Sequence, residues 1–180
     1  MANLSSTIVL VVALLLAVPA AGAAVDTVVD SCNAIRGSVD YGFCVSALRS
    51  GGPGASKADR HAHLLMAADL AVARGASAGD AANAMARSER DPAARDGLAA
   101  CGFLYGAGSV PAMRFLRGYA AARAWERGRE LLMLTMQAGI GCDAALGGAP
   151  GAKERMANAN YEFVQFSWIV TALFNILTQG

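Results

Sequence analysis

Hydrophobic and small residues recur at helical spacing through the middle of the chain. In the segment that follows Ser56, a predicted N-cap, and extends to about Glu89, they recur in steps of three and four. The positions are Leu64, Ala68, Ala71, Gly75, Ala78, Ala82 and Met85. Side chains at this spacing share one face of a helix, and small ones let a neighbouring helix approach closely. The segment therefore predicts a long, closely packed helix.

A second segment has the sharpest period in the chain. It opens at Asp91 and Pro92, which suit the cap and the first position of a helix. Its predicted apolar face comprises Leu98, Cys101, Tyr105, Gly108, Ala112, Phe115, Tyr119 and Ala122. Pro111 lies inside this pattern, and because proline has no backbone N–H we expect it to kink or divide the helix.

Two further helical segments complete the pattern. One runs from Trp125 to Leu146 and ends at a glycine-rich turn, and the other runs from Lys153 to Gln179. The apolar face of the last segment comprises Met156, Ala159, Phe163, Phe166, Val170, Leu173 and Leu177. Four amphipathic helices joined by short turns, without strand-like alternation, predict an all-α antiparallel four-helix bundle over residues 56–179.

The N-terminal part divides into an apolar run and a short cysteine-bearing segment. Residues 8–18 are apolar and too few to span a bilayer as a helix, and Pro19 and the small residues 21–23 follow them. This predicts a signal peptide over residues 1–23, although that stretch has no Lys or Arg, and a mature domain over residues 24–180. A membrane anchor or a buried strand is the alternative. Interruptions near Gly37 and Gly42 predict a short helical hairpin over residues 24–50.

The last helix raises the question of a membrane anchor, because it is apolar almost all round between Phe163 and Leu177. Such a helix can be buried, can meet a partner, or can be a C-terminal lipid-anchor signal. Polar residues such as Gln165 and Thr171 interrupt it, and the polar spacer before it is too short for an anchor signal. We therefore expect burial within the bundle, with help from the hairpin, and no stable membrane anchor.

Composition narrows the function classes. The chain has 180 residues, 55% of them hydrophobic, and a formal net charge of +1. This length suits a single domain. Without a basic excess the chain has no electrostatic basis for binding nucleic acid or an anionic lipid surface.

The four cysteines form an even set, as expected of disulfides in an oxidising compartment. They are Cys32, Cys44, Cys101 and Cys142. Their number alone leaves three pairings open. In the predicted bundle, however, Cys101 and Cys142 lie at similar heights on antiparallel neighbours, which favours a Cys101–Cys142 bridge and leaves Cys32–Cys44 for the hairpin. None has C-x-x-C spacing or a nearby histidine, so no metal site is expected.

Candidate catalytic residues are sparse. There is no G-x-S-x-G motif for a serine nucleophile. His61 and His63 are the only candidate bases, and two positions apart on a helix they point to different sides. We expect both to be partly solvated side chains near a helix start. The chain is therefore predicted not to be an enzyme, with no catalytic residues and no cofactor.

With these features the chain resembles the plant invertase and pectin methylesterase inhibitor domain family. The resemblance covers nearly the whole mature chain and rests on Tyr41 and Cys44 (Y-x-x-C) and on Cys101 and Tyr105 (C-x-x-x-Y). A fourth cysteine 41 residues further on and Asn175 near the end of the last helix complete it. The resemblance implies a helical hairpin before a four-helix bundle, with the cysteines paired first to second and third to fourth.

The resemblance also implies a function. The expected protein is secreted to the apoplast or cell wall and inhibits pectin methylesterase in a 1:1 complex that sterically covers the substrate cleft, without a cofactor. Acid invertase (beta-fructofuranosidase) is the alternative target, and a non-inhibitory structural or signalling binder is the alternative role. The Pro-Lys-Phe tripeptide associated with invertase inhibitors is absent, which favours the methylesterase. Gly141 replaces a Thr common before the fourth cysteine, at a position that the resemblance puts near the target contact. The contact residues themselves are not identified.

Overall fold

A computed structural model of the protein describes residues 26–179. The predicted signal peptide, residues 1–23, lies outside the described residues. Every regular element within 26–179 is helical.

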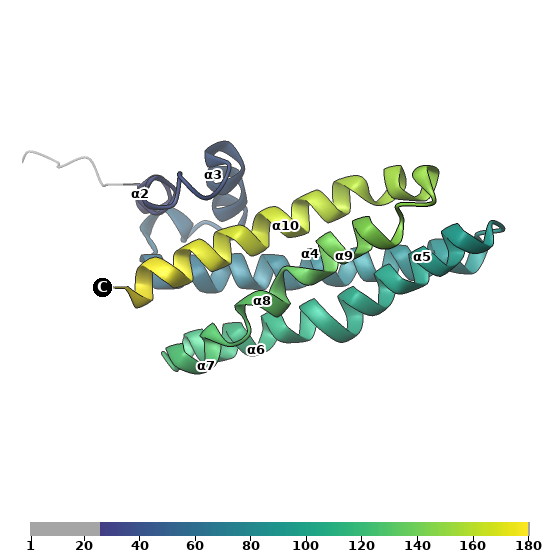
Figure 1. Cartoon of the computed structure of the whole chain (residues 1–180). Coiled ribbons are helices and arrows are strands. Elements are labelled where there is room, and N and C mark those ends of the chain that lie inside the picture. Colours follow the sequence, from purple (N-terminus) through teal and green to yellow (C-terminus); the bar gives the residue numbers. More distant parts are fainter. Residues whose placement is uncertain (1–25, 180) are drawn as a thin grey trace, which may run out of the picture.

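The core of the molecule is an antiparallel four-helix bundle, which confirms the predicted fold class (Figure 1). Its first and last members are α4 and α10, which pack against each other along their length. Its second and third members are each built from several shorter pieces. In chain order the bundle comprises α4 (Arg60–Ser88), α5 (Pro92–Phe103), η2 (Leu104–Ser109), α6 (Val110–Ala121), α7 (Trp125–Arg129), α8 (Leu132–Thr135), α9 (Gln137–Ala145) and α10 (Pro150–Thr178).

A helical hairpin precedes the bundle, as predicted. It consists of α2 (Thr27–Ala34) and α3 (Tyr41–Ser50), and a short 3₁₀ turn, η1 (Ala55–Lys57), leads from it to α4. Figure 1 shows the hairpin beside the start of α4 and the C-terminal half of α10. The Phe43 ring meets the Phe166 ring edge-on at 5.1 Å between centroids, so the hairpin covers part of the apolar α10.

The start of the first bundle helix differs from the prediction. Ser56 lies in the 3₁₀ turn, and α4 begins at Arg60, because the Asp59 carboxylate accepts a hydrogen bond from the Ala62 backbone N–H at 2.7 Å. At the next boundary the prediction is confirmed, since the Asp91 side chain caps α5 by accepting from the Ala94 N–H. The last helix begins at Pro150, three residues earlier than predicted.

The small-residue stripe of α4 packs as predicted. From Leu64 to Ala82 its members are buried, and Met85 at its end is half-buried. At Gly75 a Cβ atom would lie 2.7 Å from both Phe163 Cε2 and Val110 Cγ2. Only glycine therefore allows α10 and α6 to approach α4 this closely.

The predicted apolar face of the second helix is correct only for its first half. Leu98 and Cys101 on α5 are buried, and so is Tyr105 near the start of η2, a π-helical segment in which the backbone makes wider turns. From the end of η2 onwards the buried face lies one position later in sequence than predicted. The buried residues there are Ser109, Val110, Ala112, Met113, Leu116 and Ala120, whereas Gly108, Phe115 and Ala122 are exposed. The interruption expected at Pro111 therefore takes the form of this π segment just before the proline.

The third helix is divided into α7, α8 and α9, which corrects the prediction of one helix from Trp125 to Leu146. A regular helix would bond the Leu134 carbonyl to the Ala138 N–H. Instead the Ser109 hydroxyl stands between them, donating to Leu134 O at 2.7 Å and accepting from Ala138 N at 2.9 Å. A side chain inserted between two backbone partners breaks the helix at that turn.

Candidate binding site

Both predicted disulfides are formed. Cys32 pairs with Cys44 across the hairpin, with 5.8 Å between Cα atoms, and Cys101 pairs with Cys142 between α5 and α9, with 4.5 Å between Cα atoms. We call them the hairpin disulfide and the bundle disulfide. All four cysteines are fully buried. Two completed disulfides fit an oxidising compartment.

The predicted candidate bases lie apart. His61 Nε2 lies 2.9 Å from the Ala120 carbonyl on α6, whereas His63 turns towards the hairpin. The expectation that His63 is partly solvated is wrong, because its side chain is fully buried. Its Nε2 donates to the Ala55 carbonyl at 2.8 Å, because a carbonyl oxygen can only accept, and its Nδ1 forms a hydrogen bond of 2.8 Å with the Ser31 hydroxyl. His63 therefore joins α4 to the hairpin.

An apolar recess lies on the surface next to the bundle disulfide. It has a volume of about 340 Å³ and is lined by Leu104, Met133, Met136, Gln137, Ile140 and Gly141. The side chains of Met133 and Ile140 are strongly exposed, at 69% and 61%. Met133 lies on α8 and Ile140 on α9, on either side of the break between the two helices. We call this recess and its rim the α8–α9 face.

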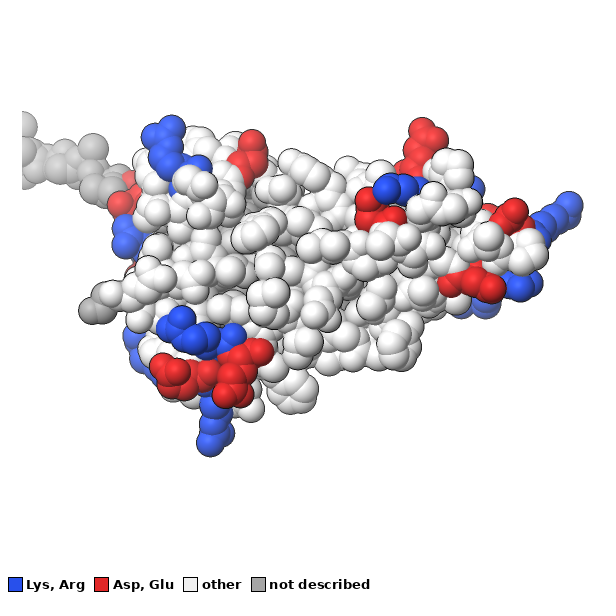
Figure 2. Space-filling model, in the orientation of Figure 1, with Lys and Arg blue, Asp and Glu red and all other residues white. Residues whose placement is uncertain are grey.

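This face lies where charged side chains are sparse. On the face of the molecule shown in Figure 2, the charged side chains gather towards the two ends and the middle is largely free of them. Large exposed apolar side chains on a surface without charges are typical of protein–protein contact sites.

Within residues 26–179, no helix has the length and apolar character needed to cross a membrane.

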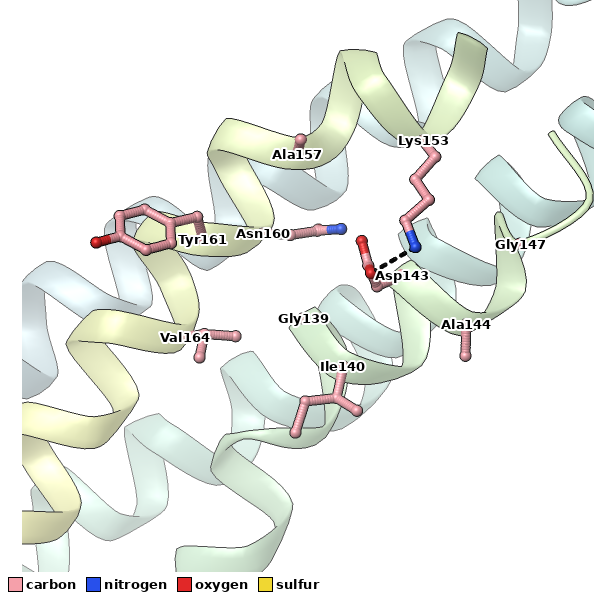
Figure 3. A pocket seen from close by; sticks show the side chains of 10 residues that line it. All are labelled: Gly139, Ile140, Asp143, Ala144, Gly147, Lys153, Ala157, Asn160, Tyr161 and Val164. Carbon is pink, nitrogen blue, oxygen red and sulfur yellow. Dashed lines mark ion pairs between the residues drawn. The ribbon is translucent and has the colours of Figure 1, made fainter. Parts of the chain in front are cut away.

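A second, larger recess of about 600 Å³ adjoins the first at Ile140 and lies between α9 and α10 (Figure 3). We call it the α9–α10 groove. Its walls are largely apolar and include Ile140 and Val164. Lys153 Nζ and Asp143 Oδ2 form an ion pair of 2.8 Å at one end.

Asn160 supplies a buried polar group to this groove. The fully buried Tyr105 hydroxyl donates to Asn160 Oδ1 at 2.9 Å, and the Tyr105 ring packs edge-on against Phe163. Burial, together with the negative charge of Asp143, raises the pKa of Tyr105 far above its usual value, so its hydroxyl remains a donor. Asn160 is 5% exposed, and its Nδ2 has no hydrogen-bond acceptor among the described residues. Leaving such a donor unpaired costs about 1–3 kcal/mol.

Sequence reasoning did not identify Asn160 or the groove. A signal was available, because Asn160 lies four positions after Met156 and three before Phe163, on the predicted buried face of the last helix. A polar residue at such a position needs a buried partner. The partner, Tyr105, belongs to the predicted face of another helix, so the pair emerges only from the packing.

The residues that the structure describes contain no group of three or more His, Cys, Asp or Glu side chains placed to hold a metal ion. The candidate site is a contact surface formed by two adjoining recesses and their exposed apolar rim. No protein-family model matches the chain, and no curated protein matches it.

Proposed function

We propose that the chain belongs to the plant invertase and pectin methylesterase inhibitor domain family and is secreted to the apoplast, where it inhibits a pectin methylesterase. The fold supports this proposal. A helical hairpin precedes a four-helix bundle, and the disulfides join the first cysteine to the second and the third to the fourth. The resemblance in sequence implies the same arrangement.

The observation that carries the proposal is the α8–α9 face. Gly141, the position next to the fourth cysteine that the resemblance relates to target contact, lies inside this apolar and uncharged recess. Met133 and Ile140 expose most of their side chains beside it. Burying such residues against a partner is favourable, at about 25 cal/mol for each Å² of apolar surface removed from water.

The proposed mechanism is steric. The α8–α9 face packs against the rim of the target's substrate cleft in a 1:1 complex, and the bundle blocks the entry of the polysaccharide. No bond is made or broken, and no cofactor takes part. The bundle disulfide joins α9 to α5 at the residue that follows Gly141, and a contact surface held rigid in this way has a lower entropy cost of binding.

Titration of the purified, oxidised protein against a plant pectin methylesterase and an acid invertase tests this function. We expect methylesterase activity to fall to a minimum at one equivalent of protein and invertase activity to remain unchanged. Inhibition of invertase at equal stoichiometry, with full methylesterase activity, would overturn the choice of target. Full activity of both enzymes would favour a non-inhibitory binder.

Gly141 offers a second test of the same surface. In Gly141→Thr the new hydroxyl adds a hydrogen-bonding group at the contact, and one intermolecular hydrogen bond should tighten inhibition of the methylesterase about two- to tenfold. The Cβ atom would lie 2.9 Å from Leu104 Cδ1, so this half-buried side chain must move slightly. Gly118→Thr, at an exposed glycine of α6 with nothing near it, is the matched control and should leave inhibition unchanged. Equal inhibition constants for the two variants and the wild type would place Gly141 outside the contact.

A further inference from the structure

The α9–α10 groove contains a hydrogen-bond donor that is fixed in direction and has no acceptor. The buried Tyr105 hydroxyl has one proton to donate, and Asn160 Oδ1 accepts it at 2.9 Å. In the structure Oδ1 is the end of the Asn160 amide that faces Tyr105, and the Nδ2 end faces the groove. Figure 3 shows the nitrogen of Asn160 directed into the space between α9 and α10, on the side of Asp143. Asn160 is 95% buried in the wall of the groove, and its Nδ2 has no acceptor among the described residues.

The surroundings of this donor define what can bind to it. Ile140 on α9 and Val164 on α10 provide apolar walls, and Gly139 and Ala144 add small residues that leave the groove open. A ligand therefore needs an apolar part of a few carbon atoms next to its acceptor oxygen. The groove, at about 600 Å³, has the size of a small-molecule site.

The charged side chains around the groove disfavour anionic ligands. Lys153 and Asp143, the charged side chains that line the groove, neutralise each other in an ion pair of 2.8 Å. A carboxylate beside Nδ2 would be repelled by Asp143 without gaining a free cation. An uncharged carbonyl oxygen accepts from Nδ2 without this cost.

We propose that the α9–α10 groove is a binding site for small uncharged carbonyl compounds, such as amides or esters with a short apolar chain. The carbonyl oxygen accepts a hydrogen bond from Asn160 Nδ2, and the chain lies between Ile140 and Val164. This site is separate from the inhibition of an enzyme, and it is tested without any target enzyme.

The test is an NMR titration of the ¹⁵N-labelled, oxidised protein with hexanamide, and in parallel with hexanoate. We expect hexanamide to produce saturable shifts in the millimolar range, centred on the Asn160 side-chain amide and on the backbone of Gly139 and Val164. Hexanoate, which has the same chain but a negative charge, should bind at least fivefold more weakly. Shifts that grow linearly without saturation, or equal affinity for the two probes, would overturn the proposal.

Two variants distinguish the contribution of the Asn160 donor to binding from the contribution of the shape of the groove. Asn160→Leu removes the donor and should weaken hexanamide binding about two- to tenfold, whereas Asn158→Leu, at an exposed position of the same helix, should leave it unchanged. Because Asn160→Leu also leaves the Tyr105 hydroxyl unpaired, a second variant, Ala157→Phe, partly fills the groove and keeps the Tyr105–Asn160 bond. It should also weaken binding at least fivefold. Unchanged affinity in Ala157→Phe would overturn the location of the site.

Discussion

Ser109→Ala tests whether one buried hydroxyl divides the third bundle helix. In the structure this hydroxyl donates to the Leu134 carbonyl at 2.7 Å and accepts from the Ala138 N–H at 2.9 Å. The serine is fully buried, so no water replaces it at this position. Alanine would leave both backbone groups without a partner.

The expected cost follows from those two groups. An unsatisfied buried polar group costs about 1–3 kcal/mol, and Leu134 lies at a partly exposed position where its carbonyl can recover some hydration. We therefore expect Ser109→Ala to lower the free energy of unfolding by about 2–4 kcal/mol, most of it from the Ala138 N–H. Direct reformation of the Leu134–Ala138 bond would require α8 and α9 to straighten and the exposed Met133 and Ile140 to move.

Urea unfolding of the oxidised protein, followed by circular dichroism, measures this loss. Ser77→Ala is the matched control, because Ser77 is exposed in the middle of α4 and should change stability by less than about 0.5 kcal/mol. Equal unfolding midpoints for the two variants would refute the reasoning. They would mean that the third helix closes its own hydrogen bond and that Ser109 is not the cause of the break.

Three further predictions follow from packing, loop length and maturation. Replacing both cysteines of the bundle disulfide by alanine should cost about 4 kcal/mol, against about 3 kcal/mol for the hairpin disulfide, because the bundle disulfide closes the longer loop; equal denaturation midpoints would contradict this. Gly75→Ala should destabilise the protein by about 1–3 kcal/mol, because the new Cβ would collide with Phe163 and Val110. Gly118→Ala, in open space on α6, should stabilise it by about 0.5–1 kcal/mol. A change of the same sign for both variants in urea unfolding would refute the packing argument. N-terminal sequencing of the secreted protein should begin within a few residues of Ala24, and an intact Met1 would refute the signal peptide.

The packing faces of the two longest helices could be predicted because their period is unbroken. In α4 the small-residue stripe, and in α10 the face that includes Phe163 and Val170, are buried or half-buried as expected. A 3.6-residue period needs no tertiary information to assign a face. The bundle disulfide was predictable as well, because its pairing depends on the relative height of Cys101 and Cys142 in an antiparallel pair of helices, although both helices are interrupted between the cysteine and the connecting turn.

The irregular parts depend on contacts between helices that sequence spacing does not encode. The π segment η2 moves the buried face by one position, so Leu116 is buried where Phe115 was predicted. The break between α8 and α9 depends on Ser109, a residue of a different helix. Pro111 signals an interruption of the second helix but not the form that it takes, and the hydroxyl inserted into the third helix has no local sequence signal.

The candidate site adjoins these irregularities. The lining of the α8–α9 face comes from both sides of the break in the third helix, and the α9–α10 groove holds an amide whose partner, Tyr105, lies in η2. The sequence pointed to Gly141 through a resemblance to a family, and the structure places it in an apolar recess. The resemblance gave no indication of the adjoining groove with Asn160.

The central proposal is that the α8–α9 face binds a plant pectin methylesterase, and calorimetric titration of two matched variants tests it most directly. Ile140→Glu places a charge on the face, at a residue 61% exposed, and Ala81→Glu places the same charge on an exposed position of α4. A charge buried without a partner at the centre of a contact should weaken binding at least tenfold, which corresponds to about 1.4 kcal/mol. The proposal predicts a 1:1 complex for the wild type and for Ala81→Glu, and at least tenfold weaker binding for Ile140→Glu. Equal affinity of the two variants for the enzyme would contradict it.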